Sequence, residues 1–401
     1  MLAVVTILAA ATATLVMALY ANRPFAQAPG LGLNAFFAFT VVGALGVPWQ
    51  TALAAVVVEG VLFIVLTAVG AREYVVGLFP KPVKFAVGTG IGLFLAIIGL
   101  QAMGIVVDDP ATLIALGSVA SNPVAILSVV GLFLTLGLYA RDVPGSIIIG
   151  IVLTTVAGWV LTRFGPISPE AGLVAGSAAV TYDITPLAGA FIDGLANVEA
   201  FTFALVVFTF FFVDFFDTAG TLVGVGQAGG FLDENGRFPD IDRPLMADAI
   251  GTTVGGALGT STVTTYIESA SGVEEGGRTG LTALTVAGLF VASLALVPLA
   301  AAIPLYASHI ALVVIGVVML RNVIDIEWND LTHSIPAGMT ILIMPFTYSI
   351  AYGIAAGVVS YPLVKLAAGE GRDVRAGHWA LAGAFVVYFV VRTGGVLTGQ
   401  L

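Results

Sequence analysis

The chain contains no cysteine and only three histidines among its 401 residues. The first absence excludes disulfides, thiolate metal sites and a cysteine nucleophile, and three scattered histidines do not form a multi-histidine metal site. Charge is also scarce, because only 9% of the residues are charged, against about 25% in soluble domains. A soluble domain with 59% hydrophobic residues would expose apolar surface on every side. The composition therefore predicts a polytopic membrane protein.

Basic residues are outnumbered, with 14 Lys and Arg against 24 Asp and Glu and a net charge of −10. This balance argues against nucleic acid as a partner. The sequence offers neither a nucleophile with a base nor a metal-ligand cluster at a recognisable spacing, so we expect no enzyme, no cofactor and no metal. Glycine is abundant at 49 residues, and membrane helices use it for close packing and for breaks.

The span count follows from the rule that a crossing helix needs about 20 mostly apolar residues. Thirteen segments meet this rule. In addition, the apolar stretch 379–393 is short and flanked by His378 and Arg392, so it either spans the membrane or lies at its interface. The thirteen segments that qualify, two of them interrupted, are 1–20, 25–46, 49–70, 84–104, 123–140, 144–163, 200–224, 245–259, 260–273, 279–300, 306–321, 336–350 and 352–368.

The orientation of the spans follows from their flanking charges. The first segment lacks the positive start of a signal peptide, which favours a true span over a cleaved leader. If the spans alternate, nearly all Lys and Arg near span ends fall on one side, which we assign to the cytoplasm. This places the C-terminus in the cytoplasm and Met1 on the outer side of the cytoplasmic membrane. We therefore expect one span to be missing before Met1.

The two halves of the chain resemble each other. A helix that begins at Thr51 is followed by Phe79-Pro80 and a glycine-rich apolar run, and a helix that begins at Thr282 is followed by Ile303-Pro304 and a similar run. Each half also has an interrupted polar segment just before that helix. Paired broken segments in inverted repeats point to a substrate site near the membrane midplane. Chance similarity among glycines and alanines is the alternative.

The first interrupted segment covers residues 24–37. Pro29, Gly30 and Gly32 prevent a regular helix here, so we expect extended backbone followed by a short helix that resumes near Asn34. Such a break is tolerated in a bilayer only where protein or a watery cavity covers it. The amide of Asn34 can donate and accept at the opening of this helix, and Phe36 is a candidate to stack on a ring.

The second interrupted segment covers residues 259–272 and has eight hydroxyl side chains within 260–271. Its β-branched residues favour a strand, so we expect two short extended pieces, one per repeat, to pair antiparallel and satisfy their backbone groups. Glu268 lies near the start of the helix that follows. Thr265, Glu268 and Ser269 are therefore candidate ligands of a substrate.

Carboxylates lie inside two apolar helices, and ionisable residues at this depth indicate function. Asp214 and Asp217 are three residues apart on one helical face. We expect Asp217, followed by the small Thr218, to bind substrate or carry a proton. For Asp214 a scaffold role and a substrate or proton role both remain open, and Glu59 is expected to brace its helix.

Four stretches of the chain resemble the AzgA-like purine permeases, the guanine, hypoxanthine and adenine branch of the nucleobase transporters of the xanthine and uracil permease type. The resemblance runs along nearly the whole chain. The stretches are APGLGLNAFFAF at 28–39, FVDFFDTAGTLVGVG at 212–226, GTSTVTTYIESASGVEEGGRTGLTAL at 259–284 and IPAGMTILIMPFTYSIAYGIAAG at 335–357.

The resemblance implies an all-α fold of seven plus seven inverted spans, which is usually dimeric. It also implies that substrate binds near Asn34, Asp217 and Glu268. Our own hypothesis is that either of the two carboxylates carries a coupling proton; sodium is the alternative ion. Core segments would be 1–70 and 200–300, and gate segments 71–199 and 301–401.

Three other functions remain as alternatives: a carrier of xanthine or uracil, an anion carrier of the same fold, and a channel. An anion carrier would need a cationic site where this sequence has carboxylates. A channel would need a continuous polar lining, whereas the polarity here is confined to two short segments and one helix. The sequence therefore favours purine nucleobase uptake by alternating access.

Overall fold

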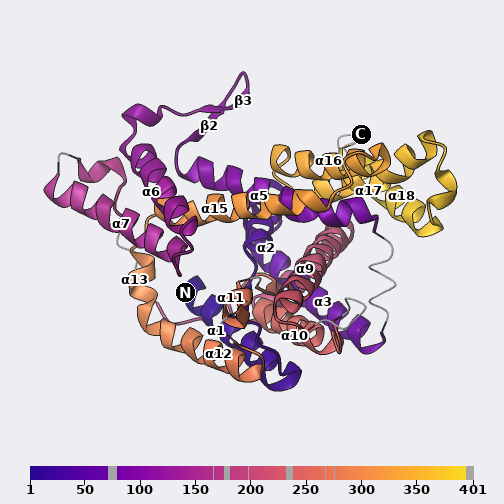
Figure 1. Ribbon diagram of the computed structural model, residues 1–401, viewed down its shortest axis with the longest axis horizontal. Helices are drawn as coiled ribbons and strands as arrows, with labels where there is room; N and C mark the ends of the chain where they lie inside the picture. The colour runs from indigo at the N-terminus through magenta and orange to yellow at the C-terminus, as the bar shows by residue number, and fades with distance from the viewer. Residues whose placement is uncertain are drawn as a thin grey trace. The chain divides into compact units, whose positions relative to one another are not determined.

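The computed structural model (Figure 1) describes residues 1–70, 79–165, 167–175, 181–196, 198–231, 238–266, 268–274 and 276–393. The chain forms two compact units, each made from two separate stretches of sequence. The first unit comprises Met1–Val75 and Ala179–Pro298, and the second comprises Val76–Ala178 and Leu299–Leu401. Residues 71–78, which follow the third predicted span in the sequence, lie outside the described residues.

Apolar helices dominate both units. Within the described residues, six are long and apolar enough to cross a membrane: Leu2–Ala21, Trp49–Ala68, Lys81–Ala102, Ser146–Phe164, Gly280–Ala301 and Leu305–Asp325. Shorter apolar helices accompany them, at Leu31–Ala44, Pro123–Tyr139, Thr202–Phe215, Leu331–Phe346, Tyr352–Ala367 and Ala376–Val387. The protein is therefore a multi-pass membrane protein. The count of thirteen spans and the inverted repeat stay predictions.

In the first unit, α10 packs against both α1 and α3, and α12 packs against α1 (Figure 1). Small residues allow the close approach of α3 and α10, because a Cβ on Gly60 would lie 2.7 Å from the backbone nitrogen of Thr253. The helices of this unit are α1 (Leu2–Val16), η1 (Met17–Ala21), α2 (Leu31–Ala35), η2 (Phe36–Ala44), α3 (Trp49–Ala68), α8 (Phe191–Ala196), α9 (Ala200–Ala228), α10 (Asp242–Leu258), α11 (Ser269–Glu274), α12 (Gly280–Ser293) and η5 (Leu294–Leu296), with α13 (Val297–Ala301) at the unit boundary.

Two short buried strands pair inside the first unit. Strand β1 (Gln27–Pro29) runs antiparallel to β4 (Val263–Thr265), with Gln27 opposite Thr265 and Pro29 opposite Val263. Beyond the strand, Gly30 N donates to Thr262 O at 3.1 Å. The predicted pairing of the two interrupted segments is thus confirmed. Pro29 lacks an amide hydrogen and cannot continue the hydrogen bonds of a helix. The strand pairing therefore supplies partners for the backbone groups of these segments.

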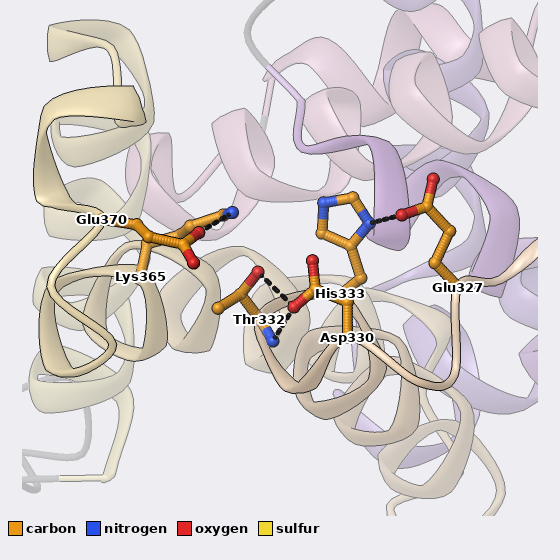
Figure 2. Close-up of polar contacts among 6 residues, drawn as sticks. All are labelled: Glu327, Asp330, Thr332, His333, Lys365 and Glu370. Atoms are coloured by element: carbon orange, nitrogen blue, oxygen red, sulfur yellow. Dashed lines mark hydrogen bonds and ion pairs between the residues drawn. The ribbon is translucent and has the colours of Figure 1, made fainter.

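The second unit centres on α5, which packs against α15, α16 and α17. At the crossing of α5 and α15 two glycines meet, and a Cβ on Gly92 would lie 2.8 Å from Gly316 O. Lys365 of α17 forms an ion pair with Glu370 (Figure 2). The elements of this unit are α5 (Lys81–Ala102), β2 (Val106–Asp109), β3 (Leu113–Leu116), η3 (Val119–Ser121), α6 (Pro123–Tyr139), α7 (Ser146–Phe164), η4 (Pro169–Ala171), α14 (Leu305–Ser308), α15 (Ile310–Met319), η6 (Leu320–Asp325), α16 (Leu331–Phe346), α17 (Ile350–Ala367), η7 (Gly371–Asp373) and α18 (Ala376–Thr393).

A hairpin between α5 and α6 was not expected from the sequence. Strands β2 and β3 pair antiparallel, with Asp109 opposite Leu113. Asp109 Oδ1 accepts hydrogen bonds from Thr112 N at 2.8 Å, Ala111 N at 2.9 Å and Thr112 Oγ1 at 2.9 Å. The hydrogen bonds from Thr112 and Ala111 hold the pKa of the Asp109 carboxyl below its ordinary value. An all-α description of the chain with one strand pair was therefore incomplete.

Candidate functional site

Helix α9 carries three of the predicted site residues past the strand pair. Asp214 and Thr218 are one turn apart and both are 0% exposed, whereas Asp217 is half-buried. The Thr218 hydroxyl lies 2.7 Å from Thr264 Oγ1 on β4. The helix thus places a buried polar face against the strands and leaves the Asp217 side chain partly accessible.

Asp248 of α10 is the centre of the polar contacts between the strands and the helices. Its Oδ1 accepts hydrogen bonds from Thr218 Oγ1 at 2.9 Å, Gln27 Nε2 at 3.1 Å and Thr265 Oγ1 at 3.2 Å. Gln27 belongs to β1 and Thr265 to β4, so one carboxylate oxygen holds both strands and α9. Asp248 is 1% exposed, and donors from hydrogen-bonding side chains make such burial of a carboxylate tolerable.

Further side-chain contacts hold the predicted residues around the strands in place. Ser261 Oγ donates to Asn34 Oδ1, and Asn34 Nδ2 donates to Pro29 O at 3.4 Å. Ala26 N donates to Ser269 Oγ at 3.0 Å. Asn34 lies in the short helix α2, which begins at Leu31, three residues before the predicted restart. Asn34 and Ser269 therefore tie the two broken segments to each other.

Asp217 and Glu268 come together although they lie on different elements. Glu268 directly precedes α11, as predicted, and its side chain is exposed. The Asp217 and Glu268 carboxyls interact electrostatically, and both also act on Tyr266. Tyr266 donates a hydrogen bond to Pro29 O. Two carboxyls near a tyrosine and a broken backbone can accept several N–H groups from one planar ligand.

The aromatic residues near the site are packed against one another. Phe36 is 1% exposed and meets Phe210 edge-on, with ring centroids 5.0 Å apart. Phe63 of α3 stacks on Phe211 at 4.4 Å. Phe36 therefore contacts protein on α9, and its predicted role of stacking on a ligand stays a prediction.

Glu59 reaches the same polar cluster from α3. It is 0% exposed, and its Oε2 accepts a hydrogen bond from Thr262 Oγ1 at 3.0 Å. Its carboxyl also interacts with those of Asp214 and Asp248. The side chain thus connects α3 to the residue before β4. The bracing role expected from the sequence stays a prediction.

Sequence reasoning missed Asp248 and Gln27. The signal for Asp248 was present, since it is an ionisable residue among Ala247, Ala249 and Gly251 in a segment already assigned as a span. Gln27 lies within the first interrupted segment, but its importance depends on its contact with Asp248, which lies 221 residues further along the chain.

A second polar group lies in the second unit, at the start of α16 (Figure 2). Asp330 Oδ1 accepts hydrogen bonds from Thr332 N and Thr332 Oγ1, both at 2.7 Å, and these hold the pKa of Asp330 below its ordinary value. His333 Nδ1 lies 3.3 Å from Glu327 Oε2. Ligand atoms of Glu327, Asp330 and His333 lie within 4.8 Å of one another. Helix capping and the His–Glu contact account for these positions, so we assign no ligand here.

Apolar helices, a strand pair formed from two broken segments and a cluster of carboxyls beside it define a membrane transporter. Residues 1–356 match the family model described as Permease family (Xan_ur_permease). The chain belongs to this family, whose members are permeases and not enzymes.

Curated relatives align over nearly the whole chain. The putative permease MJ0326 of Methanocaldococcus jannaschii is 44% identical, and the alignment covers 98% of this chain and 87% of that protein. The adenine permease AdeP of Escherichia coli is 40% identical, with 92% and 81% covered. The guanine/hypoxanthine permease PbuG of Bacillus subtilis is 38% identical, with 96% and 86% covered.

The fold is similar to that of a solved bicarbonate transporter. The transmembrane domain of BicA, from a cyanobacterium, superposes with a TM-score of 0.59 over 88% of this chain and 89% of that chain, at 18% sequence identity. At this identity the likeness concerns the fold alone. It supports a helical fold of this kind, and the inverted repeat stays a prediction.

Proposed function

We propose that the protein takes up purine nucleobases, with adenine, guanine and hypoxanthine as candidates, across the cytoplasmic membrane. The observation that carries the proposal is the electrostatic interaction of the Asp217 and Glu268 carboxyls, on elements next to the strand pair. Relatives named as adenine and guanine/hypoxanthine permeases support the substrate class. A purine presents ring N–H donors next to ring nitrogen and carbonyl acceptors, which suits carboxylates beside amide and hydroxyl groups.

In this proposal each site residue has a chemical role. The carboxyls of Asp217 and Glu268 accept N–H groups of the purine, and the exposed Glu268 closes over it. Asn34 and Ser269 position the two broken segments. Thr218 and Thr265 hold the floor of the site through Asp248. Proton symport is the proposed coupling, with Asp217 and Glu268 as the carriers expected from the sequence.

We further propose that the first unit is the core domain and the second the gate domain, and that rocking between them alternates access. The strand pair β1–β4 and the carboxyls around it lie in the first unit. This suits a domain that carries the substrate. The functional form is proposed to be a homodimer with its C-terminus in the cytoplasm.

An anion such as bicarbonate or sulfate is the second candidate, because the fold is similar to that of a bicarbonate transporter. The carboxyls of Asp214, Asp217, Asp248 and Glu268 around the strands oppose it, since like charges disfavour a bound anion. Xanthine and uracil remain alternatives within the nucleobases.

Uptake of labelled substrates tests the proposal. The gene is expressed in a host lacking its own nucleobase permeases, and labelled adenine, guanine, hypoxanthine, uracil and sulfate are compared. We expect accumulation of at least one purine, and its loss in Glu268→Gln and Asp217→Asn. The matched control Glu327→Gln changes an exposed carboxylate of the second unit and should transport like the wild type. Sulfate uptake without purine uptake would reject the proposal, and unchanged hypoxanthine accumulation in Glu268→Asn would reject this residue's role.

A further inference from the structure

Three carboxyl groups from three helices are buried together in the first unit. Glu59 of α3 and Asp214 of α9 are both 0% exposed, and Asp248 of α10 is 1% exposed. Phe63, one turn beyond Glu59 on α3, stacks on Phe211 and Phe215, which flank Asp214 on α9. The Glu59 carboxyl interacts with that of Asp214 and lies within electrostatic range of Asp248. An ionised carboxylate can only accept hydrogen bonds. Because like charges this close disfavour each other, joint burial of the two carboxyls favours a state in which one of them holds a proton.

The hydrogen-bond donors show where this proton resides. Asp248 Oδ1 accepts three hydrogen bonds from neutral donors, which favours the ionised form of Asp248. Glu59 receives one, from Thr262 Oγ1 to Oε2. Among the described residues, Glu59 Oε1 has no conventional donor. This oxygen is thus available for a proton shared with Asp214.

The titratable groups on the elements around α3 are mostly acidic. Among the described residues, Lys365 is the one lysine or arginine that is buried, and it belongs to the second unit. The elements packed against α3 are α8, α9, α10 and η2. Helix α9 contributes Asp214 and the half-buried Asp217, and α8 contributes the exposed Asp193. Helix α10 contributes Asp248, and Asp242 and Arg243 are exposed at its start. No residue of η2 is titratable. Three adjacent buried carboxylates cannot all be ionised in such surroundings.

The Thr218 hydroxyl connects this cluster to the substrate carboxylate. It donates to Asp248 Oδ1 at 2.9 Å and lies 3.5 Å from Asp214 Oδ1. A hydroxyl has one hydrogen to donate, so it can serve only one of the two acceptors at a time. Thr218 also directly follows Asp217 on α9 and contacts Thr264 on β4. A change of charge at Asp214 is thus transmitted to the turn that carries Asp217 and to the strand pair.

We propose that Glu59 and Asp214 together bind the proton that is co-transported with the substrate. The loaded state holds one proton between the two carboxyls. Release of this proton to water leaves two anions in contact beside Asp248, which disfavours this arrangement of α3 and α9 and favours the opposite-facing state of the transporter. The step moves one proton and no electrons. The inference rests on the proposed function and differs from it by assigning the coupling proton to Glu59 and Asp214 in place of Asp217 and Glu268.

Reconstitution separates coupling from transport. Wild type, Glu59→Gln and Asp217→Asn are placed in liposomes, and labelled adenine and hypoxanthine are followed in two assays, exchange at equal pH and accumulation driven by an imposed proton gradient. A glutamine keeps the hydrogen bonds of a neutral Glu59. We expect Glu59→Gln to retain exchange and lose accumulation above the external concentration, whereas Asp217→Asn loses both. Gradient-driven accumulation by Glu59→Gln at the wild-type level would overturn the inference. A wild type that exchanges no purine would instead overturn the proposed function, and this inference with it.

Infrared spectroscopy provides a readout that does not depend on transport. Difference spectra of the purified wild type between acidic and alkaline pH are expected to contain the C=O stretch of a buried, protonated carboxyl. Glu59→Gln and Asp214→Asn should each remove this band, and the exposed-residue control Glu327→Gln should retain it. Persistence of the band in both of the first two variants would place the proton elsewhere. If Glu59→Gln also loses exchange, loss of the band still supports the shared proton and its persistence still refutes it.

Discussion

Asp248 is the residue whose removal should disturb the first unit most. In Asp248→Ala, the donors Gln27 Nε2, Thr218 Oγ1 and Thr265 Oγ1 lose the oxygen they share. Thr218 can turn to Thr264, 2.7 Å away, and Gln27 Nε2 keeps its hydrogen bond to Thr265 Oγ1 at 3.2 Å. One N–H of Gln27 and the hydroxyl hydrogen of Thr265 then lack an acceptor. A buried donor without a partner costs about 1–3 kcal/mol, and hydrogen bonds inside membrane proteins are worth about 0.6–1.7 kcal/mol. We expect Asp248→Ala to lower the free energy of unfolding by about 2–4 kcal/mol, and Asp248→Asn, which keeps one acceptor oxygen, by about half as much.

Thermal unfolding of the purified protein in detergent measures this effect. For a unit of about 200 residues, each kcal/mol shifts the midpoint by roughly 2–4 °C, so Asp248→Ala should unfold about 4–16 °C below the wild type. The matched control is Asp242→Ala, an exposed aspartate in the first turn of the same helix, and it should stay within about 2 °C. Equal midpoints for the two variants would refute the view that Asp248 holds the strands to α9.

Two further predictions concern packing and the hairpin. In Gly60→Ala the new Cβ would collide with Thr253 Oγ1 and lie 2.7 Å from the Thr253 backbone nitrogen, so size-exclusion chromatography should show a reduced folded yield. Gly288→Ala, with nothing within 4 Å of the new Cβ, should fold like the wild type. Asp109→Ala should accelerate amide hydrogen exchange in 106–116, because Asp109 holds the hairpin turn. The pKa of Asp109 is depressed, so its stabilisation is fully present above about pH 4 and is lost as the pH falls through the lower folded-state value; a wild-type hairpin with the same pH profile as Asp109→Asn would contradict this.

The strand pair could be predicted because its cause is local. Pro29 and Gly30 exclude a helix over one segment, and threonines favour an extended backbone over the other. Two unpaired segments in a membrane must then find partners for their backbone groups. The β2–β3 hairpin has a weaker signature, since its strands have four residues each and its turn depends on the Asp109 side chain.

The site was predictable in its residue types and less so in its connections. Asp217 and Glu268 stood out as charges at depth, and Asp248 had the same signature but was overlooked inside a short span. That three donors from α9, β1 and β4 converge on Asp248 depends on contacts between distant parts of the chain. Such convergence arises from tertiary packing, which hydrophobic periodicity does not encode.

Exchange by the purified protein in liposomes tests the central claim most directly, because it requires a substrate site but no driving ion. Liposomes loaded with unlabelled adenine, guanine or hypoxanthine are given a trace of the labelled purine, with uracil and bicarbonate measured in parallel. The account predicts rapid entry of a labelled purine in the wild type and its loss in Glu268→Gln. Exchange of bicarbonate without any purine exchange would contradict it.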